Sequence, residues 1–155
     1  MLLANCVHVA DIDSHDLVGL ARSAVCRLAF EGERIFVQGG SADRVFILLD
    51  GAVTVERSSA SGSSTSYEVF GPYATFGDLA LLGEPERRYT ATTRVDSVFI
   101  ELPAIKLVEV LSANPPQALA WRGAIMARLH RKEPNEASSF DWRILGKLPN
   151  LFAAA

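Results

Sequence analysis

A glycine, a carboxylate and two arginines stand close together in the segment 76–91. Gly77 and Asp78 come first, a short apolar run follows, and Arg87 and Arg88 come after it. A glycine lets the backbone approach a ligand closely. A helical turn that begins at about Leu79 would point its free N–H groups at an anion, and a guanidinium could hold a phosphate through two parallel hydrogen bonds.

Asp78 restricts which anion could bind beside Arg87. A carboxylate repels a neighbouring anion unless it accepts hydrogen bonds from hydroxyl groups of the same ligand. One phosphate with one hydroxyl nearby describes a ribose cyclic phosphate. The alternative interpretation is a surface ion pair between Asp78 and Arg87, worth about 0–1 kcal/mol and without a ligand.

Short β-branched or aromatic runs separated by turns with glycine surround this segment. The runs lie at 34–37, 45–49, 52–55, 67–70 and 89–102. Many short strands at such spacing are typical of an antiparallel sandwich or a jelly-roll barrel. The sequence therefore predicts a mainly β fold, an antiparallel β-roll (a jelly-roll-like barrel) over about residues 30–102.

Helices are predicted on both sides of the β-roll. An acidic and hydroxyl start followed by apolar residues at helical spacing predicts a helix over about 15–28. Pro103 and the pair Asn114-Pro115 are typical helix starts and predict helices over 104–112 and 115–131. On the last helix, the arginines are expected to form a solvated face; they are Arg122, Arg128 and Arg131. Trp121 is expected to be a core or docking residue rather than one that stacks on a base.

The sequence after the last helix divides into a polar linker and an apolar tail. Residues 1–131 are predicted to form one domain, and 132–155 to be a linker and tail that could serve as a lid or a docking helix. The apolar residues of the tail are Phe140, Trp142, Ile144, Leu145, Leu148, Leu151 and Phe152.

The 76–91 segment resembles the phosphate-binding cassette of cyclic nucleotide-binding domains. That family, found in catabolite activator proteins, protein kinase A regulatory subunits and cyclic-nucleotide-gated channels, carries a pattern close to F-G-E-[LI]-A-L followed by an arginine. Phe76 to Leu82 reads FGDLALL, with Arg87 nine residues after Asp78. Upstream runs at 30–35 and 45–51 resemble the family's turn-and-strand signature, and the similarity covers residues 15 to about 130.

The resemblance implies a role for each residue of the cassette. Arg87 would pair with the cyclic phosphate, assisted by backbone N–H groups around Leu79 and Ala80. Asp78, in place of the family's glutamate, would bind the ribose 2′-OH, and Gly77 would allow close approach to the ribose. The helix from Pro115, or the tail beyond it, would cover the base.

Two registers of the arginine remain open. With Arg87 as the phosphate ligand, the match to the family pattern continues without a gap into the following strand, and this register is preferred. The alternative register makes Arg88 the phosphate ligand, with Thr90 two residues after it. Family members tuned to cyclic GMP often have Thr or Ser directly after the arginine, whereas Arg87 is followed by Arg88. Cyclic AMP is therefore favoured over cyclic GMP, and Thr90 keeps the second ligand open.

Composition and motifs exclude several other classes of protein. The formal charge of −3 disfavours a nucleic-acid partner, and no apolar run reaches the roughly 18 residues of a membrane span. Cys6 and Cys26 are interpreted as reduced thiols of a cytoplasmic protein. The three histidines lie outside the predicted barrel, which argues against a metal site of the cupin kind, and no nucleophile motif is present. The chain is therefore predicted not to be an enzyme, and no cofactor other than the nucleotide ligand is expected.

The sequence predicts a cyclic nucleotide-binding regulatory domain that acts by ligand-induced movement of its C-terminal helices. Its partners would be the nucleotide and an effector domain or protein outside this chain, and the 115–131 helix could mediate an oligomer. The alternative is a degenerate barrel of the same fold that no longer binds nucleotide and serves as a protein-interaction module. Asp78, one methylene shorter than the family's glutamate, and Tyr89 are the residues that point to this alternative.

Overall fold

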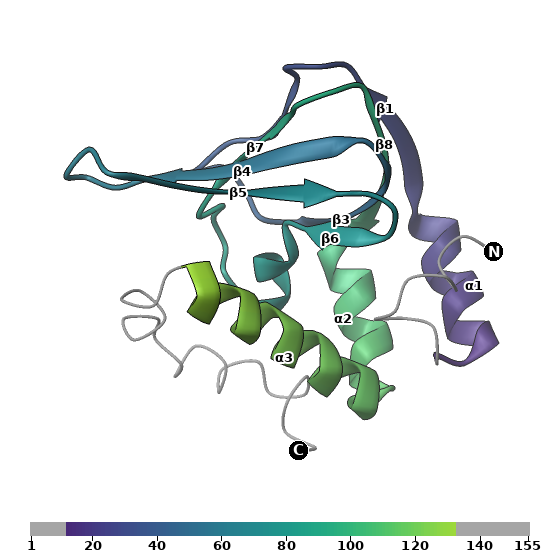
Figure 1. Cartoon of the computed structure of the whole chain (residues 1–155). Helices are drawn as coiled ribbons and strands as arrows, with labels where there is room; N and C mark the ends of the chain where they lie inside the picture. Colours follow the sequence, from purple (N-terminus) through teal and green to yellow (C-terminus); the bar gives the residue numbers. More distant parts are fainter. Residues whose placement is uncertain (1–11, 133–155) are drawn as a thin grey trace.

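The computed structural model describes residues 12–132, which form two four-stranded antiparallel sheets flanked by helices (Figure 1). One sheet has the order β1-β8-β3-β6, formed by Val25–Ala29, Ser97–Pro103, Arg44–Asp50 and Ala74–Phe76. The other has the order β2-β7-β4-β5, formed by Arg34–Phe36, Thr90–Thr93, Ala52–Ser58 and Ser64–Phe70. This architecture confirms the predicted mainly β fold, although the two sheets are not closed into a barrel.

One hydrophobic cluster lies between the two sheets. Phe46 of β3 is paired in register with Phe76 of β6, and their rings stack with centroids 4.9 Å apart. Phe99 of β8 meets both rings edge-on. Because alternate residues of a strand face the same side, these aromatic positions all enter the space between the sheets. The cluster therefore fixes β6, whose last residue precedes the 77–82 turn.

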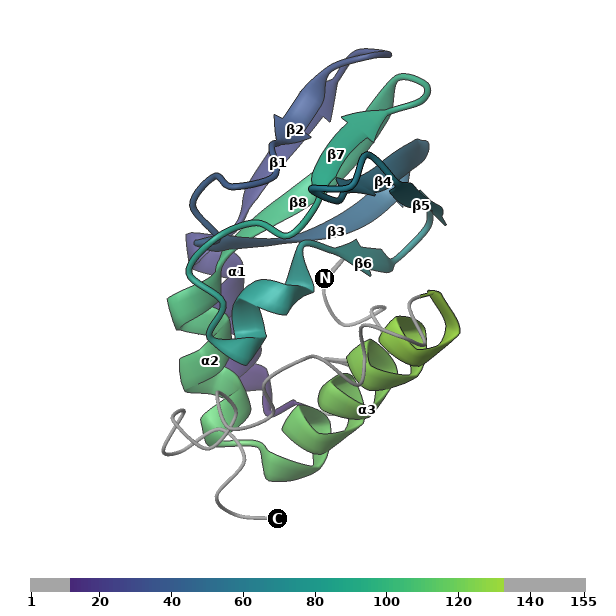
Figure 2. The ribbon, with the colours of Figure 1, turned by 90° about the vertical axis from the view of Figure 1, so that its left-hand side faces the viewer.

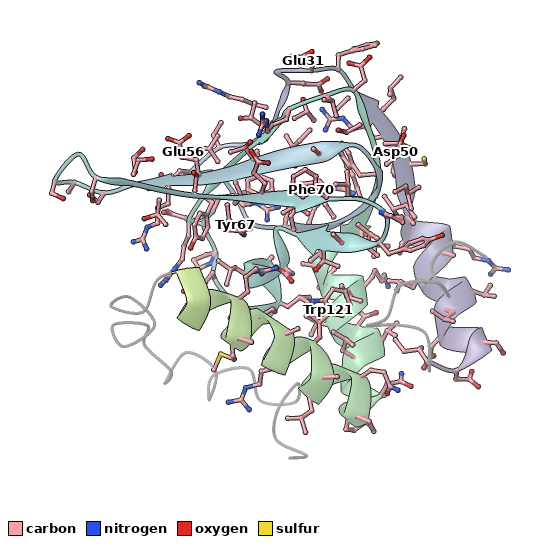
Figure 3. All side chains as sticks on the ribbon, viewed as in Figure 1. Glu31, Asp50, Glu56, Tyr67, Phe70 and Trp121 are labelled. Carbon is pink, nitrogen blue, oxygen red and sulfur yellow. The ribbon has the colours of Figure 1, made fainter. Side chains whose placement is uncertain are left out.

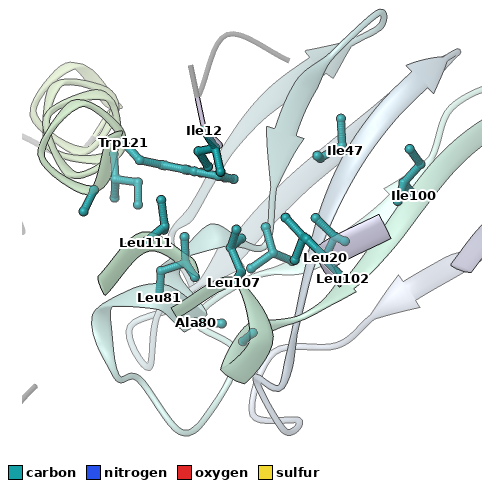
Figure 4. Packing of buried hydrophobic residues seen from close by; sticks show 14 of the residues in the cluster. Ile12, Leu20, Ile47, Ala80, Leu81, Ile100, Leu102, Leu107, Leu111 and Trp121 are labelled. Carbon is teal, nitrogen blue, oxygen red and sulfur yellow. The ribbon is translucent and has the colours of Figure 1, made fainter. Parts of the chain in front are cut away.

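A second cluster lies between the helices and the outer face of the β1-β8-β3-β6 sheet (Figure 4). The helices are α1 (Ser14–Ser23), α2 (Ala104–Ser112) and α3 (Pro115–Lys132). Leu107 and Leu111 of α2 are buried there together with Trp121 of α3. A short 3₁₀ helix, η2 (Asp78–Leu82), contributes Leu81 and Leu82 to the same cluster. The turn after β6 is thus packed against both C-terminal helices.

The helix predicted over 15–28 is wrong in its second half. α1 ends at Ser23, and β1 pairs with β8 from Val25↔Glu101 to Ala29↔Ser97. Apolar residues at helical spacing misled the prediction, because a run this short fits a strand as well. Residues 25–29 form a strand because pairing with β8 provides the backbone hydrogen bonds of this segment.

The remaining predicted boundaries fall near the structural ones. α2 and α3 begin where the sequence places the helices over 104–112 and 115–131. The predicted linker and tail lie outside the described residues, apart from Lys132 at the end of α3. No helix between residues 12 and 132 combines the length and hydropathy that crossing a membrane requires.

The arrangement places α3 beside η2. Viewed from two directions, α3 runs below the sheets and past the 77–82 turn (Figure 1; Figure 2). Side chains of α3 can therefore reach the segment that carries the candidate site.

Candidate functional site

Gly77 joins β6 to η2 in a backbone conformation that requires glycine. Its φ is +71°, and a Cβ atom there would lie 2.9 Å from Nη1 of Arg87 and 2.9 Å from the Phe46 ring. A side chain would thus be strained and would also push the guanidinium away. Gly77 is what lets the arginine lie directly against the turn.

Arg87 is buried beneath this turn, with 6% of its surface exposed. Its Nη1 donates to the carbonyl of Gly77 (3.0 Å) and its Nη2 to the carbonyl of Arg44 (2.8 Å). The guanidinium carbon lies 4.1 Å from the centre of the Phe36 ring. The Nε atom is buried without a hydrogen-bond acceptor among the described residues.

The charge of Arg87 is only weakly compensated. Carbonyl groups and ring faces are its direct neighbours, and it forms no ion pair within hydrogen-bond distance among residues 12–132. Burial lowers the pKa of Arg87, and the charge of Asp43 only partly offsets this. A buried cation with neutral partners attracts an anion, because an anion would replace the lost hydration.

Asp78 is buried even more deeply, at 2% exposure, and its carboxylate is held by three donors. Thr75 donates to Oδ2 at 3.2 Å, and the Trp121 indole donates to the same oxygen at 3.1 Å. Arg128 forms an ion pair with Oδ1. Burial by itself raises the pKa of Asp78, but the charge and hydrogen bond of Arg128, together with the other two donors, outweigh burial and lower it.

Arg128 was not among the site residues predicted from the sequence, and its assignment to a solvated helix face is wrong. Its side chain is 19% exposed, and the charge of Asp78 raises its pKa although burial opposes this. Its guanidinium carbon also lies 5.8 Å from the centre of the Tyr67 ring. Spacing offers the one available signal: Trp121 and Arg128 are seven residues apart, which places them on one face of a helix.

The other predicted residues are distributed around the same place. Arg88 forms an ion pair with Glu84 at 3.1 Å, and its side chain is 26% exposed. The amide of Ala80 donates within the turn, to Gly77. Thr90 begins β7, where its hydroxyl accepts a hydrogen bond from the backbone N–H of Gln38, and it does not line the pocket described next.

A small pocket lies between Arg87 and Asp78. Its volume is about 20 Å³, and its walls include six of the seven predicted site residues together with aromatic rings. They are Gly77, Asp78, Leu79, Ala80, Arg87 and Arg88, with Phe36, Tyr67 and Tyr89. Tyr67 of β5 lies on the side of the sheets that faces α3, the helix that carries Trp121 (Figure 3). Since one water needs about 10–15 Å³, a larger ligand requires some of these side chains to move.

Comparison with known proteins gives consistent matches. The family model described as "Cyclic nucleotide-binding domain" matches residues 29–114. The "CRP-like cAMP-activated global transcriptional regulator" of Mycobacterium tuberculosis is 24% identical over 106 residues, which are 68% of this chain and 47% of that protein. The "Cyclic AMP receptor protein" of Thermus thermophilus is 30% identical over 76 residues, which are 49% and 35% of the two chains. The chain thus spans less than half the length of these relatives.

Solved structures show the same fold. The sensor domain of the transcriptional regulator DNR from Pseudomonas aeruginosa aligns with a TM-score of 0.73 at 24% identity, covering 86% of this chain and 90% of that one. Thermus thermophilus catabolite activator protein aligns with a TM-score of 0.67 at 22% identity, covering 87% and 63%. With the family model matching more than half of the sequence, the chain belongs to the cyclic nucleotide-binding domain family.

Proposed function

We propose that this chain binds a cyclic nucleotide between Arg87 and Asp78 and acts as a regulatory sensor domain. Arg87 carries this proposal: it is a buried cation, bound to carbonyls, that borders the pocket. A cyclic phosphate would supply the missing negative charge and accept two charge-assisted hydrogen bonds. Asp78 would accept from the ribose 2′-OH, and the turn residues Leu79 and Ala80 would approach the phosphate.

Cyclic AMP is the preferred ligand. Arg88 stands directly after Arg87 and forms an ion pair with Glu84, so no hydroxyl occupies the position that cyclic-GMP-selective members use. The hydroxyl of Thr90, three residues after Arg87, accepts a hydrogen bond from the backbone N–H of Gln38. These contacts support the Arg87 register and leave Thr90 without an evident role in the selection of guanine.

The site is suited to moving α3. Trp121 and Arg128 both bond Asp78, so a ligand that engages this carboxylate changes the forces on α3 directly. A ligand at 100 times its Kd would favour the binding-competent state by about 2.7 kcal/mol if the other state does not bind. The output would reside in an effector domain or protein outside this chain, in a cytoplasmic setting, with α3 as a candidate oligomer contact. We propose a regulatory role without catalysis.

A second candidate function is that of an interaction module that no longer binds nucleotide. The observation that favours it is the small size of the pocket, about 20 Å³, which is little more than one water molecule needs. In that case Asp78 and Arg87 would be structural charges only. The two functions make opposite predictions for a titration.

Calorimetric titration of the whole chain with cyclic AMP and cyclic GMP tests the proposal. We expect saturable binding of cyclic AMP and a loss of more than about 100-fold in Arg87→Met, because two charge-assisted bonds are each worth roughly 1.5–3 kcal/mol. Arg34→Met is the matched control, since Arg34 is exposed on β2, and its affinity should stay within about twofold of the wild type. Absence of heat at millimolar nucleotide in every protein would favour the interaction module.

A further inference from the structure

The phosphate side and the sugar side of the proposed site differ in how far the charge of their key residue is already paired. On the phosphate side, Arg87 contacts neutral groups and its Nε lacks an acceptor within residues 12–132. On the sugar side, both oxygens of Asp78 accept hydrogen bonds, Oδ1 from Arg128 and Oδ2 from Thr75 and Trp121. A carboxylate has about four acceptor positions, and three of those of Asp78 are in use.

Two of the three donors to Asp78 come from α3. Trp121 and Arg128 are separated by two helical turns, so one face of α3 supplies both an indole N–H and a guanidinium. Both donors use acceptor positions of Asp78 that a ligand hydroxyl could otherwise take. Both residues lie beyond position 114, where the match to the family model ends.

A ribose hydroxyl and Arg128 cannot both occupy the same place beside Asp78. A hydroxyl must come within about 2.5–3.0 Å of the carboxylate to bond it, and Arg128 and Trp121 already lie within hydrogen-bond distance of its two oxygens. A groove of about 320 Å³, lined in part by Arg128, lies between α3 and the strands β5 and β6. Phe70, Ala74 and Ala124 also line this groove, so there is open space beside the Arg128 side chain.

We propose that α3 is an internal competitor for the sugar half of the site, with Arg128 and Trp121 holding Asp78 in the place of a ribose hydroxyl. The ligand-free chain is then autoinhibited, and nucleotide binds with an affinity reduced by the work of displacing these contacts. By the reciprocity of coupled equilibria, whatever weakens the α3 contact raises the affinity for ribose-bearing ligand. This inference rests on the proposed function and gives the direction of its coupling.

The test is the affinity for cyclic AMP of Arg128→Met, with Arg122→Met as the matched control. Arg122 is on the same helix, and it is not among the partners of Asp78, which are Arg128, Trp121 and Thr75. We expect Arg128→Met to bind cyclic AMP at least about fivefold more tightly than the wild type, the lower bound of a typical coupling. Arg122→Met should stay within about twofold. The analogue 2′-deoxy cyclic AMP, which lacks the competing hydroxyl, should gain less from Arg128→Met than cyclic AMP does.

A second variant and an optical readout cover a loss of folding in Arg128→Met. Trp121→Phe removes one donor to Asp78 and keeps an aromatic ring, and it should also bind cyclic AMP more tightly. In Trp142→Phe protein, where Trp121 is the remaining indole, ligand should change the emission as the indole N–H loses its carboxylate partner. Binding by the wild type with equal or weaker binding by folded Arg128→Met and by Trp121→Phe overturns the internal competitor. Absence of binding in every protein instead removes the proposed function, and the competitor with it.

Discussion

Arg87 and Asp78 lie in the same turn region and are both almost fully buried, but Arg87 has neutral partners whereas Asp78 has a charged one. Arg87 has carbonyls and aromatic faces around it, and burial lowers its pKa. Asp78 has a full guanidinium partner and two further donors, and its pKa is lowered in spite of burial. The charge of Asp78 is thus part of the contacts that stabilise the fold. The charge of Arg87, in contrast, has no ionic partner within hydrogen-bond distance among residues 12–132.

The largest expected consequence of this contrast is in folding stability. Asp78→Asn leaves Arg128 without its counter-charge, and breaking a buried pair in this way costs about 3 kcal/mol or more. Arg87→Met replaces a weakly compensated charge by an apolar side chain of similar length, and we expect it to cost less than half as much. Urea unfolding followed by circular dichroism measures both free energies. Glu109→Gln, which removes an exposed ion pair with Lys106, is the control. An equal or larger loss in Arg87→Met would contradict the contrast.

A smaller effect is expected from acid. The pKa of Asp78 in the folded chain lies below its ordinary value of 3.8, chiefly because Arg128 outweighs burial. The stabilisation is therefore present above that ordinary value and is lost as the pH falls through the lower folded pKa. Unfolding free energies measured from neutral pH down into the acid range should show this loss in the wild type. Asp78→Asn should show a smaller loss, and an identical acid profile would argue against the Arg128 contact.

The smallest effect is expected at Arg88. It is paired with Glu84 and is partly exposed, so removing its charge should change both stability and nucleotide affinity by about 0–1 kcal/mol. Titration of Arg88→Met with cyclic AMP, beside Arg87→Met, measures the difference directly. If Arg88→Met lost binding while Arg87→Met kept it, Arg88 would be the phosphate ligand. The contrast between Arg87 and Asp78 would then not concern the binding arginine.

The predicted fold and the structure agree most closely where patterns are local and repeated. Alternating apolar strands and turn glycines predict the sheets, and the starts at Pro103 and Asn114-Pro115 predict α2 and α3. The prediction fails at β1, where a five-residue run fits either periodicity and where pairing with β8 decides. It also fails to show that the two sheets stay open, because closure depends on which strand edges meet.

For the candidate site, the residues of the turn and their charges could be predicted from the sequence: glycine at 77, a carboxylate at 78 and an arginine at 87, at a spacing that matches a known cassette. Residues 76–82 are contiguous in the sequence, so they are neighbours in any fold of the chain. The partners of those charges could not be predicted in the same way, because they come from distant parts of the chain. Arg128 reaches Asp78 across 50 residues of sequence, because the packing of α3 against η2 and α2 brings one helix face onto the turn. Contacts of this kind depend on how whole helices and strands pack against one another, and local sequence patterns do not predict that packing.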